Sequence, residues 1–437
     1  MSCCAPTCAD DLAILSNCPY ETQILINMAF DYSSREAYLL QPAKSSIIQS
    51  CSKISEKVPE DFWTFGNTVM PSTKKAIHIG ICRTDKDTCK ATIEENLKKS
   101  RRTLYSLMGV GLHGENGLDP PTAMSIMNTY ILPIMSYGLE IVTPSGKCLE
   151  YLSVQFKKLL KQLLSLPKTL ADPAIRVYII SEMLPIEAQV DIKILSFYGN
   201  VIRQEKVSIE WQLAERQLNF KALNSNSWFS HLRRSFLKYN LTDPTQYLHN
   251  PISKYQWKKQ ISAKVQKYCT TNFLEQTRLY SSLKYLSLIY TPGKCHPIVN
   301  TINTMNVREI SRIPTKLKIV TGSYVLQVDR VKFRQNVERG ICELCGEVEE
   351  NLTHFLLTCK CLEFVRKPII EDLISSCSKE IARFSYKEMK FDILQLIVDP
   401  FVYIGKFKEE EAHTVIQSII LLIEPKCRRL CYNLSSL

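Results

Sequence analysis

Three cysteines and one histidine lie close together in the last third of this 437-residue chain, in the text CELCGEVEENLTHFLLTC. Cys342 and Cys345 form a CxxC pair, and His354 and Cys359 follow within the same text. Thiolate and imidazole donors at such spacing are typical of four-coordinate zinc, and four protein ligands exclude a catalytic water. The pattern therefore predicts a structural zinc site. The alternatives are that these are ordinary buried side chains, or that Cys361 replaces one ligand.

A second candidate for metal chemistry is the pair of adjacent acids Asp10 and Asp11. They lie between short apolar runs in the text APTCADDLAILS, which predicts a hairpin with the acids at its turn. Carboxylates at such a turn can bind Mg²⁺ for phosphoryl transfer, but Asp is also common in ordinary solvated turns. The pair alone leaves both interpretations open.

The net charge of +12 is concentrated in two segments. Residues 254–294 carry eight basic residues against one acid, with aromatic residues interleaved, and residues 308–339 carry eight against three. Basic side chains displace counterions from phosphates and aromatic rings stack on bases, so these segments predict a surface that binds RNA or DNA. The alternative is that they are solvated faces of amphipathic helices. The candidate contacts are Lys258, Lys259, Lys264, Lys267, Arg312, Lys316 and Lys318.

The hydrophobic patterns around these residues predict a mainly α fold with a small α/β piece. Between residues 92 and 221, apolar residues recur at i, i+3, i+4 and i+7, which predicts four or five helices separated by proline-containing breaks. Pro133 lies inside one such pattern and predicts a bend. Residues 1–83 mix short strands, at 12–15 and 76–81, with a helix over 22–38. The tail from residue 363 predicts two or three amphipathic helices that cover the Cys/His cluster.

The composition excludes several classes of protein. With 45% hydrophobic and 22% charged residues, the chain is neither disordered nor fibrous. Its apolar runs fall short of the ~20 residues that span a bilayer, and the acidic opening without a basic residue before Arg35 does not resemble a secretion signal. The seventeen cysteines are therefore expected to be mostly reduced thiols in an intracellular protein of the nucleus or cytoplasm.

Taken in order, several motifs resemble the reverse transcriptases of non-LTR retrotransposons (LINEs). Residues 7–11 (TCADD) are similar to motif C of the palm, residues 40–45 (LQPAKS) resemble motif D, and residues 78–81 (HIGI) resemble motif E, the primer grip. Residues 107–114 and 130–140, together with the Cys/His cluster, resemble the thumb and the C-terminal zinc region of jockey-like elements. The resemblance covers nearly the whole chain.

The resemblance implies an RNA-directed DNA polymerase that acts in target-primed retrotransposition. Asp10 and Asp11 would bind Mg²⁺ in the intact family enzyme, Lys44 would lie near the incoming nucleotide, and His78 and Gly80 would contact the primer. The family's motif A aspartate, fingers and endonuclease precede motif C, which begins here at residue 7. Two metal ions need carboxylates from different strands, so the chain is expected to be a truncated C-terminal fragment that binds nucleic acid without polymerising.

These expectations divide the chain into five parts. They are a partial palm with motifs C to E (1–90), a helical thumb-like bundle (91–250), a basic aromatic-rich segment (251–335), a zinc knuckle (336–365) and C-terminal helices (366–437). The expected partners are RNA and DNA and, in a full-length element, the upstream palm, fingers and endonuclease, but no membrane. The alternative function is a co-opted, non-catalytic scaffold that contains zinc and binds nucleic acid or protein.

Overall fold

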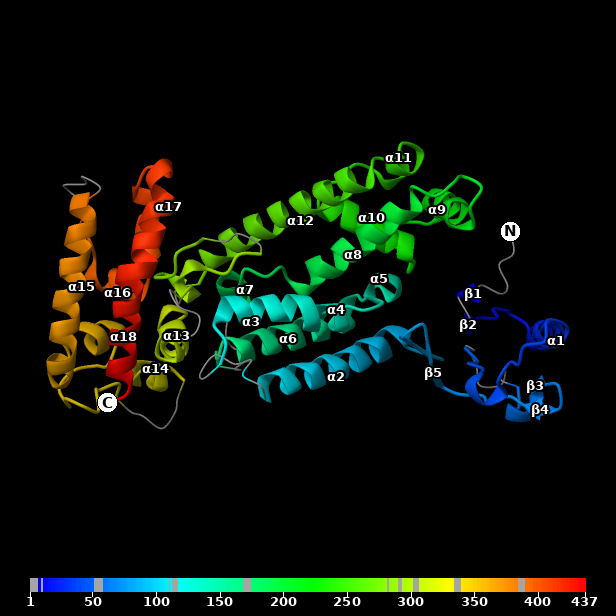
Figure 1. Ribbon diagram of the computed structural model, residues 1–437, viewed down its shortest axis with the longest axis horizontal. Coiled ribbons are helices and arrows are strands. Elements are labelled where there is room, and N and C mark those ends of the chain that lie inside the picture. Colours follow the sequence, from blue (N-terminus) through cyan, green and yellow to red (C-terminus); the bar gives the residue numbers. More distant parts are fainter. Residues whose placement is uncertain are drawn as a thin grey trace. The chain divides into compact units, whose positions relative to one another are not determined.

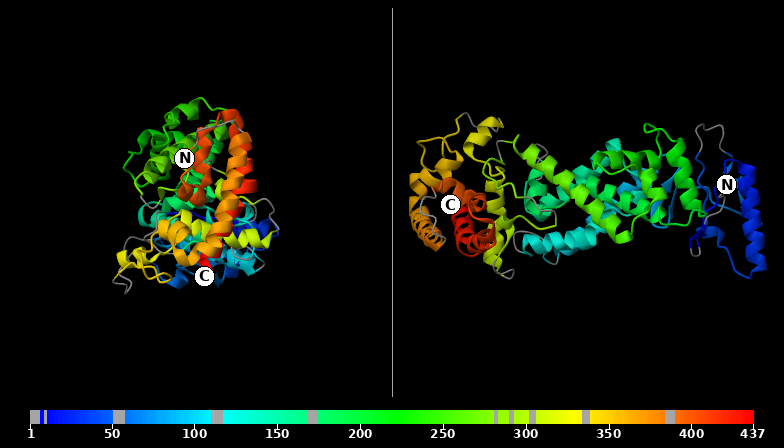
Figure 2. Two further views of the ribbon diagram at one scale, coloured as in Figure 1. Left: turned by 90° about the vertical axis from the view of Figure 1, so that its left-hand side faces the viewer. Right: turned by 90° about the horizontal axis from the view of Figure 1, so that it is seen from above.

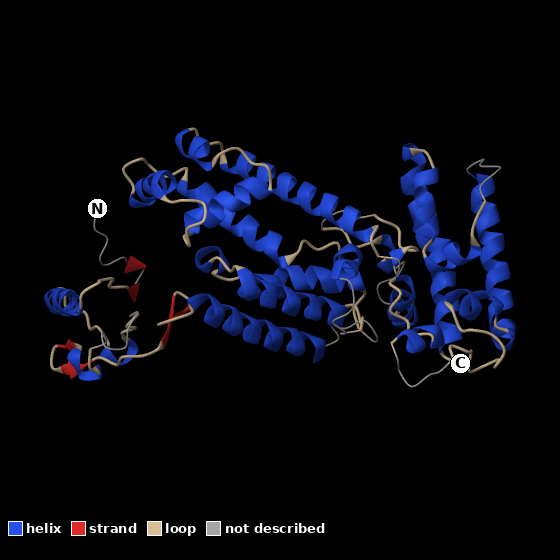
Figure 3. Cartoon of the chain, turned by 180° about the vertical axis from the view of Figure 1, so that it is seen from behind, coloured by secondary structure: helices blue, strands red, loops and turns tan. Residues whose placement is uncertain are grey.

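The computed structural model describes residues 7–8, 11–50, 58–109, 111, 117–167, 174–280, 283–289, 293–301, 306–333, 339–383 and 390–437. These residues are mainly helical, which confirms the predicted fold class at that level (Figure 3). The chain divides into two compact units. The first comprises Met1–Lys99 and Ile134–Leu149, and the second comprises Ser100–Pro133 and Glu150–Leu437.

The helices and strands are labelled in chain order (Figure 1). The α-helices are α1 (Pro19–Arg35), α2 (Thr88–Gly109), α3 (Pro120–Ile126), α4 (Leu132–Met135), α5 (Leu139–Val142), α6 (Gly146–Leu163), α7 (Ala174–Ser181), α8 (Ile186–Val201), α9 (Ile209–Phe220), α10 (Trp228–Lys238), α11 (Pro244–His249), α12 (Lys254–Thr277), α13 (Val307–Val320), α14 (Gln327–Lys332), α15 (Glu363–Arg383), α16 (Ile393–Val398), α17 (Glu409–Ser418) and α18 (Glu424–Ser435). The strands are β1 (Thr7–Cys8), β2 (Asp11–Leu12), β3 (Thr64–Phe65), β4 (Thr68–Val69), β5 (Lys75–His78) and β6 (Ile81–Thr84). No helix among the described residues is both long enough and apolar enough to cross a membrane.

The strands form three separate antiparallel pairs, β1 with β2, β3 with β4 and β5 with β6. Cys8 lies opposite Asp11, so the hairpin expected at the acidic pair is present. The single strand expected over residues 76–81 is wrong, because the chain reverses at Ile79 and Gly80, which both have positive φ, as in a type I′ turn. Among the described residues none of the pairs joins another into the larger sheet that a palm would need.

The first unit has a small hydrophobic core where α1 packs against the β3–β4 hairpin. Ile26 of α1 is buried with Trp63, Phe65 and Met70. The Gln23 amide donates to the carbonyl oxygen of Thr64 at 2.7 Å and accepts from its N–H at 2.9 Å, which ties the helix to the strand. Apolar burial and this paired hydrogen bond together hold the short strands, which are too small to be stable alone.

Pro133 lies inside α4, at the end of a helical segment that runs from α3 to α4. A π-helical turn, Met127–Ile131, separates these two helices immediately before the proline. Proline has no N–H to donate to the preceding turn, and a π turn accommodates such a break in the hydrogen-bond ladder. The helical structure continues through Pro133, and the predicted bend stays a prediction.

Helices α8 and α12 pack along each other in the second unit, and α12 also contacts α7 (Figure 1). Trp257 of α12 is fully buried against Gly199 of α8. A Cβ at position 199 would lie 2.1 Å from Nε1 of Trp257, so only glycine permits this approach. The indole N–H donates to the carbonyl oxygen of Leu195 at 2.9 Å, which satisfies the buried donor.

The C-terminal helices gather into one group, coloured orange to red in Figure 2. Helix α18 packs against α13, α15 and α16, and both α15 and α18 contact the turn that carries His354. The tail therefore covers the Cys/His cluster with α15 and α18, but its described residues contain four α-helices where two or three were expected.

Candidate metal centre

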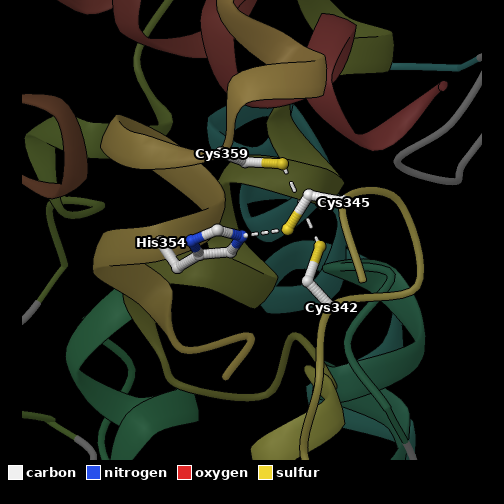
Figure 4. A group of neighbouring side chains, drawn as sticks. All are labelled: Cys342, Cys345, His354 and Cys359. Carbon is white, nitrogen blue, oxygen red and sulfur yellow. Dashed lines mark hydrogen bonds between the residues drawn. The ribbon is translucent and has the colours of Figure 1, made fainter. Parts of the chain in front are cut away.

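The four predicted ligands meet in the second unit (Figure 4). One ligand atom from each of Cys342, Cys345, His354 and Cys359 lies within 4.8 Å of all the others. Sγ of Cys342 is 4.0 Å from Sγ of Cys359, and Sγ of Cys345 is 3.4 Å from Nε2 of His354. This cluster could hold a metal ion, and no other group of this kind occurs among the described residues.

The CxxC pair lies on a tight turn that its own backbone closes. The N–H of Cys342 donates to the carbonyl oxygen of Val348, and the N–H of Gly346 donates to that of Cys342, each at 2.9 Å. Gly346 has a φ of +68°, a conformation that glycine adopts without strain. The glycine after the second cysteine thus lets the chain reverse and turns both sulfur atoms to the same side.

His354 and Cys359 lie on the next segment, a π-helical turn over His354–Thr358 and the residue that follows it. Asn351 precedes the helical residues that lead into this turn, and its Oδ1 accepts from the N–H of His354 at 2.9 Å. Oγ1 of Thr358 is 3.3 Å from Nδ1 of His354. A proton on Nδ1 can therefore be donated to Thr358, which leaves the Nε2 lone pair directed at the sulfur atoms, the usual arrangement for a metal-binding histidine.

The ligands lie in a largely dry environment. Cys359 and Cys342 are 0% and 2% exposed, and His354 is 5% exposed. Burial raises the pKa of Cys342, whereas the backbone N–H groups of Glu347 and Val348 lower the pKa of Cys345. Isolated buried thiolates would be costly, so a bound cation would stabilise this set of donors.

Two residues that the sequence analysis did not identify support the ligands. Thr358 contacts the histidine ring, and Arg366 donates from Nη2 to the carbonyl oxygen of Cys359 at 3.0 Å. The position of Thr358, four residues after His354, was a usable signal, because residues at i and i+4 share one face of a helix. Arg366 gave no such signal. Its approach depends on how α15 folds back over the cluster.

Cys361, the alternative ligand, lies outside the cluster. Its side chain is exposed, and Sγ donates to the carbonyl oxygen of Leu344 at 3.2 Å. The four ligands first predicted therefore form the set, and Cys361 stays beside it as a free thiol.

The lysines predicted to bind nucleic acid on α12 are mostly accessible. Lys258, Lys259 and Lys267 are exposed, whereas Lys264 is half-buried and donates to the carbonyl oxygen of Asn240 at 3.1 Å. The first basic segment therefore presents a charged surface.

The second basic segment is exposed at Arg308, Lys332 and Arg339, but one of its three predicted contacts is buried. The prediction for Lys316 is wrong, because its side chain is fully buried between α13 and α18. Its Nζ lies 3.3 Å from Oε2 of Glu424 and donates to the carbonyl oxygen of Ile397. Arg312 and Lys318, on the same helix, are half-buried. Part of the charge on α13 thus balances charge inside the protein.

The residues of the polymerase-like motifs lie in the first unit. Asp10 is outside the described residues, and Asp11 is exposed on β2. Lys44 is exposed at the end of the 3-10 turn Pro42–Lys44, and it forms no ion pair with Asp11 among the described residues. His78 is half-buried on β5, and Gly80 is exposed in the following turn.

No protein-family model matches the sequence, and a comparison with curated proteins finds no match. The resemblance to reverse transcriptases therefore depends on the order of the short motifs alone.

Proposed function

We propose that this chain is a nucleic-acid-binding protein related to the C-terminal part of non-LTR reverse transcriptases, with one structural Zn²⁺ held by Cys342, Cys345, His354 and Cys359. The observation that carries the proposal is the convergence of these four ligand atoms within 4.8 Å. The zinc joins the turn at residues 343–350, none of which is buried, to the helical turn that carries His354.

The distances between the ligand atoms fit zinc. In a tetrahedral site with Zn–S of about 2.3 Å, two sulfur atoms lie roughly 3.8 Å apart. With Zn–N of about 2.0–2.1 Å, a sulfur and a nitrogen lie roughly 3.6 Å apart. The corresponding pairs here, Cys342 with Cys359 and Cys345 with His354, are 4.0 and 3.4 Å apart. The donors thus need only small shifts to coordinate one ion.

The ligand set also favours a structural role. Four protein ligands complete the tetrahedron, so no position remains for a reacting water. Three thiolates and one Zn²⁺ carry a net negative charge, and the nearby guanidinium of Arg366 partly neutralises it.

Nucleic-acid binding is proposed for the exposed side of α12. The helix carries five lysines and a single acid, Glu275, within the residues 254–277. Lys259 and Lys267 extend into solvent, and Tyr255 exposes 75% of its surface. Such a face can neutralise phosphates and stack on bases without reading sequence.

The experiment is a salt titration of binding to single-stranded RNA, followed by fluorescence anisotropy. The affinity should fall steeply with salt, and the double substitution Lys259→Gln/Lys267→Gln should make the log–log slope shallower by about 1.4, since each phosphate contact contributes about 0.7. The matched control is Lys367→Gln/Lys379→Gln, which removes two exposed lysines from α15. A wild-type protein without RNA affinity would refute this part and favour the scaffold function, while the zinc proposal would stand.

A further inference from the structure

A cavity of about 230 Å³ lies between α8 and α12, away from the metal centre. Its volume is below the roughly 300–1,000 Å³ of pockets for drug-sized ligands but far above the space of one water. The cavity could therefore hold one small chemical group, such as an inorganic ion. The lining residues are Ser196, Asn200, Arg203, Lys254, Trp257 and Lys258.

The lining of this cavity is strongly basic. It includes Arg203, Lys254 and Lys258 but no acid. Neither lysine has a hydrogen-bond or ion-pair partner within the described part of the chain. The C-terminal end of α8 and the N-terminal end of α12 meet here, so their opposite helix dipoles largely cancel. The side chains therefore decide the sign of the local potential, and three like charges around one cavity repel one another until an anion enters.

The guanidinium of Arg203 has only part of its hydrogen-bonding capacity used by the protein. Its Nη2 donates to Oδ1 of Asn200 at 3.0 Å, which fixes the plane of the guanidinium. Its Nη1 is buried and has no hydrogen-bond partner among the residues that the structure describes. A buried donor without a partner is unfavourable, and a ligand oxygen in the cavity would satisfy it.

Trp257 gives the cavity a rigid floor. Its ring is held by the hydrogen bond to Leu195 and by the close contact with Gly199. Arg203 and the two lysines thus surround a preformed space whose polar donors also include Ser196 and Asn200. A planar guanidinium fork, two ammonium groups and neutral donors suit a tetrahedral oxyanion.

We infer that this cavity is a phosphate-binding site, with Arg203, Lys254 and Lys258 as its charged donors. Two of its three cations, Lys254 and Lys258, lie on α12 together with the exposed Lys259 and Lys267, so the natural source is a backbone phosphate of the nucleic acid. In this respect the inference rests on the proposed function. Free inorganic phosphate offers the same chemistry, and the experiment separates the two sources.

The decisive variant is Asn200→Asp. The new carboxylate can accept the same hydrogen bond from Arg203 and so preserves the fold, but it places a negative charge at the cavity and occupies the guanidinium. Arg203→Gln is the second variant, because it removes the charge without adding one. The matched control is Arg216→Gln, which removes an exposed arginine from α9, outside the cavity.

Binding of inorganic phosphate is measured by isothermal titration calorimetry and by the shift of the Trp257 indole N–H signal in NMR spectra. Wild type and Arg216→Gln should bind phosphate equally, and Asn200→Asp and Arg203→Gln should bind about tenfold more weakly or worse, as expected for a lost charge-assisted hydrogen bond. The affinity for a short oligouridylate should fall in the same two variants. Equal phosphate binding by wild type and Asn200→Asp, or none by wild type, would overturn the site.

The remaining outcomes separate the site from the proposed function. If phosphate binding falls in Asn200→Asp while oligouridylate binding does not, the assignment to a backbone phosphate is overturned. If wild type binds phosphate at this cavity but binds no oligouridylate, the phosphate site is supported and the proposed nucleic-acid function fails.

Discussion

The buried charges between α13 and α18 give a prediction that can be worked out residue by residue. Glu424 lies between two cations, with Lys316 Nζ at 3.3 Å and Arg428 Nε at 3.2 Å. Arg428 also donates from Nη2 to the carbonyl oxygens of Ile298 and Asn300, at 2.6 and 2.7 Å. All three charged side chains are at most 2% exposed. Glu424 thus pairs directly with two cations that water does not reach, and the buried carboxylate of Asp399 adds a weaker electrostatic attraction on Lys316.

The two ends of this network should respond differently to substitution. Glu424→Gln removes the only carboxylate that forms an ion pair with these two cations among the described residues, and removal of one partner from a buried ion pair costs about 3–5 kcal/mol. Lys316→Met leaves Glu424 paired with Arg428, and it mainly deprives the carbonyl oxygen of Ile397 of its donor, which costs about 1–3 kcal/mol. We therefore expect Glu424→Gln to be the more destabilising change, although it alters fewer atoms.

Amide hydrogen exchange followed by mass spectrometry measures the loss of stability around α13 and α18 locally. It does not assume that the whole chain unfolds in one step. Amides of α13 and α18 should exchange roughly a hundredfold faster or more in Glu424→Gln and roughly tenfold faster in Lys316→Met. The control, Lys318→Met on the same helix, changes a half-buried lysine and should shift stability by about 0.5 kcal/mol or less. Equal effects of Glu424→Gln and Lys316→Met, or the reverse order, would refute the account of charge compensation.

Three further predictions concern other parts of the chain. Chelation of zinc should speed amide hydrogen exchange over residues 341–361, while the amides of α8 and α12 remain protected. Faster amide exchange along the whole chain would contradict a local role for the ion. Burial alone would raise the pKa of Asp191, but hydrogen bonds from His231, Lys238 and Tyr239 lower it to about 2. Asp191 therefore contributes about 2 kcal/mol to the free energy of unfolding above pH 4, and this contribution is lost as the pH falls toward 2. Asp191→Asn should abolish this pH dependence in acid-unfolding curves. Gly199→Ala should cost at least about 1–3 kcal/mol in thermal unfolding because its Cβ has no space beside the indole, and an unchanged melting temperature would show that α8 and α12 pack differently.

The Cys/His cluster was predictable because its geometry is local. The CxxC spacing and Gly346 specify one turn, and the six residues from His354 to Cys359 span little more than one helical turn. The four donors therefore converge without help from distant segments. The helical content was predictable for a similar reason, since hydrophobic periodicity is a property of each segment by itself.

Other features depend on contacts that no local pattern contains. Lys316 is buried because it pairs with Glu424, which lies on α18, far from Lys316 in the sequence. In the sequence, Lys316 looks like one more cation of a basic run. The cavity likewise depends on distant segments, since Arg203 lies in the turn after α8 and Lys254 begins α12, with three helices between them in the sequence. Ile79 was assigned to a strand because β-branched residues are rare at the positive φ that the β5–β6 turn imposes on it.

The measurement that tests the central claim most directly is zinc K-edge X-ray absorption on protein purified under reducing conditions, combined with elemental analysis. The account predicts one zinc per chain, with three sulfur atoms at about 2.3 Å and one nitrogen at about 2.0–2.1 Å. Cys345→Ser should lose the ion or replace one sulfur by a lighter atom. Protein without zinc, or zinc in a shell of oxygen and nitrogen atoms alone, would contradict the assignment of Cys342, Cys345, His354 and Cys359 as its ligands.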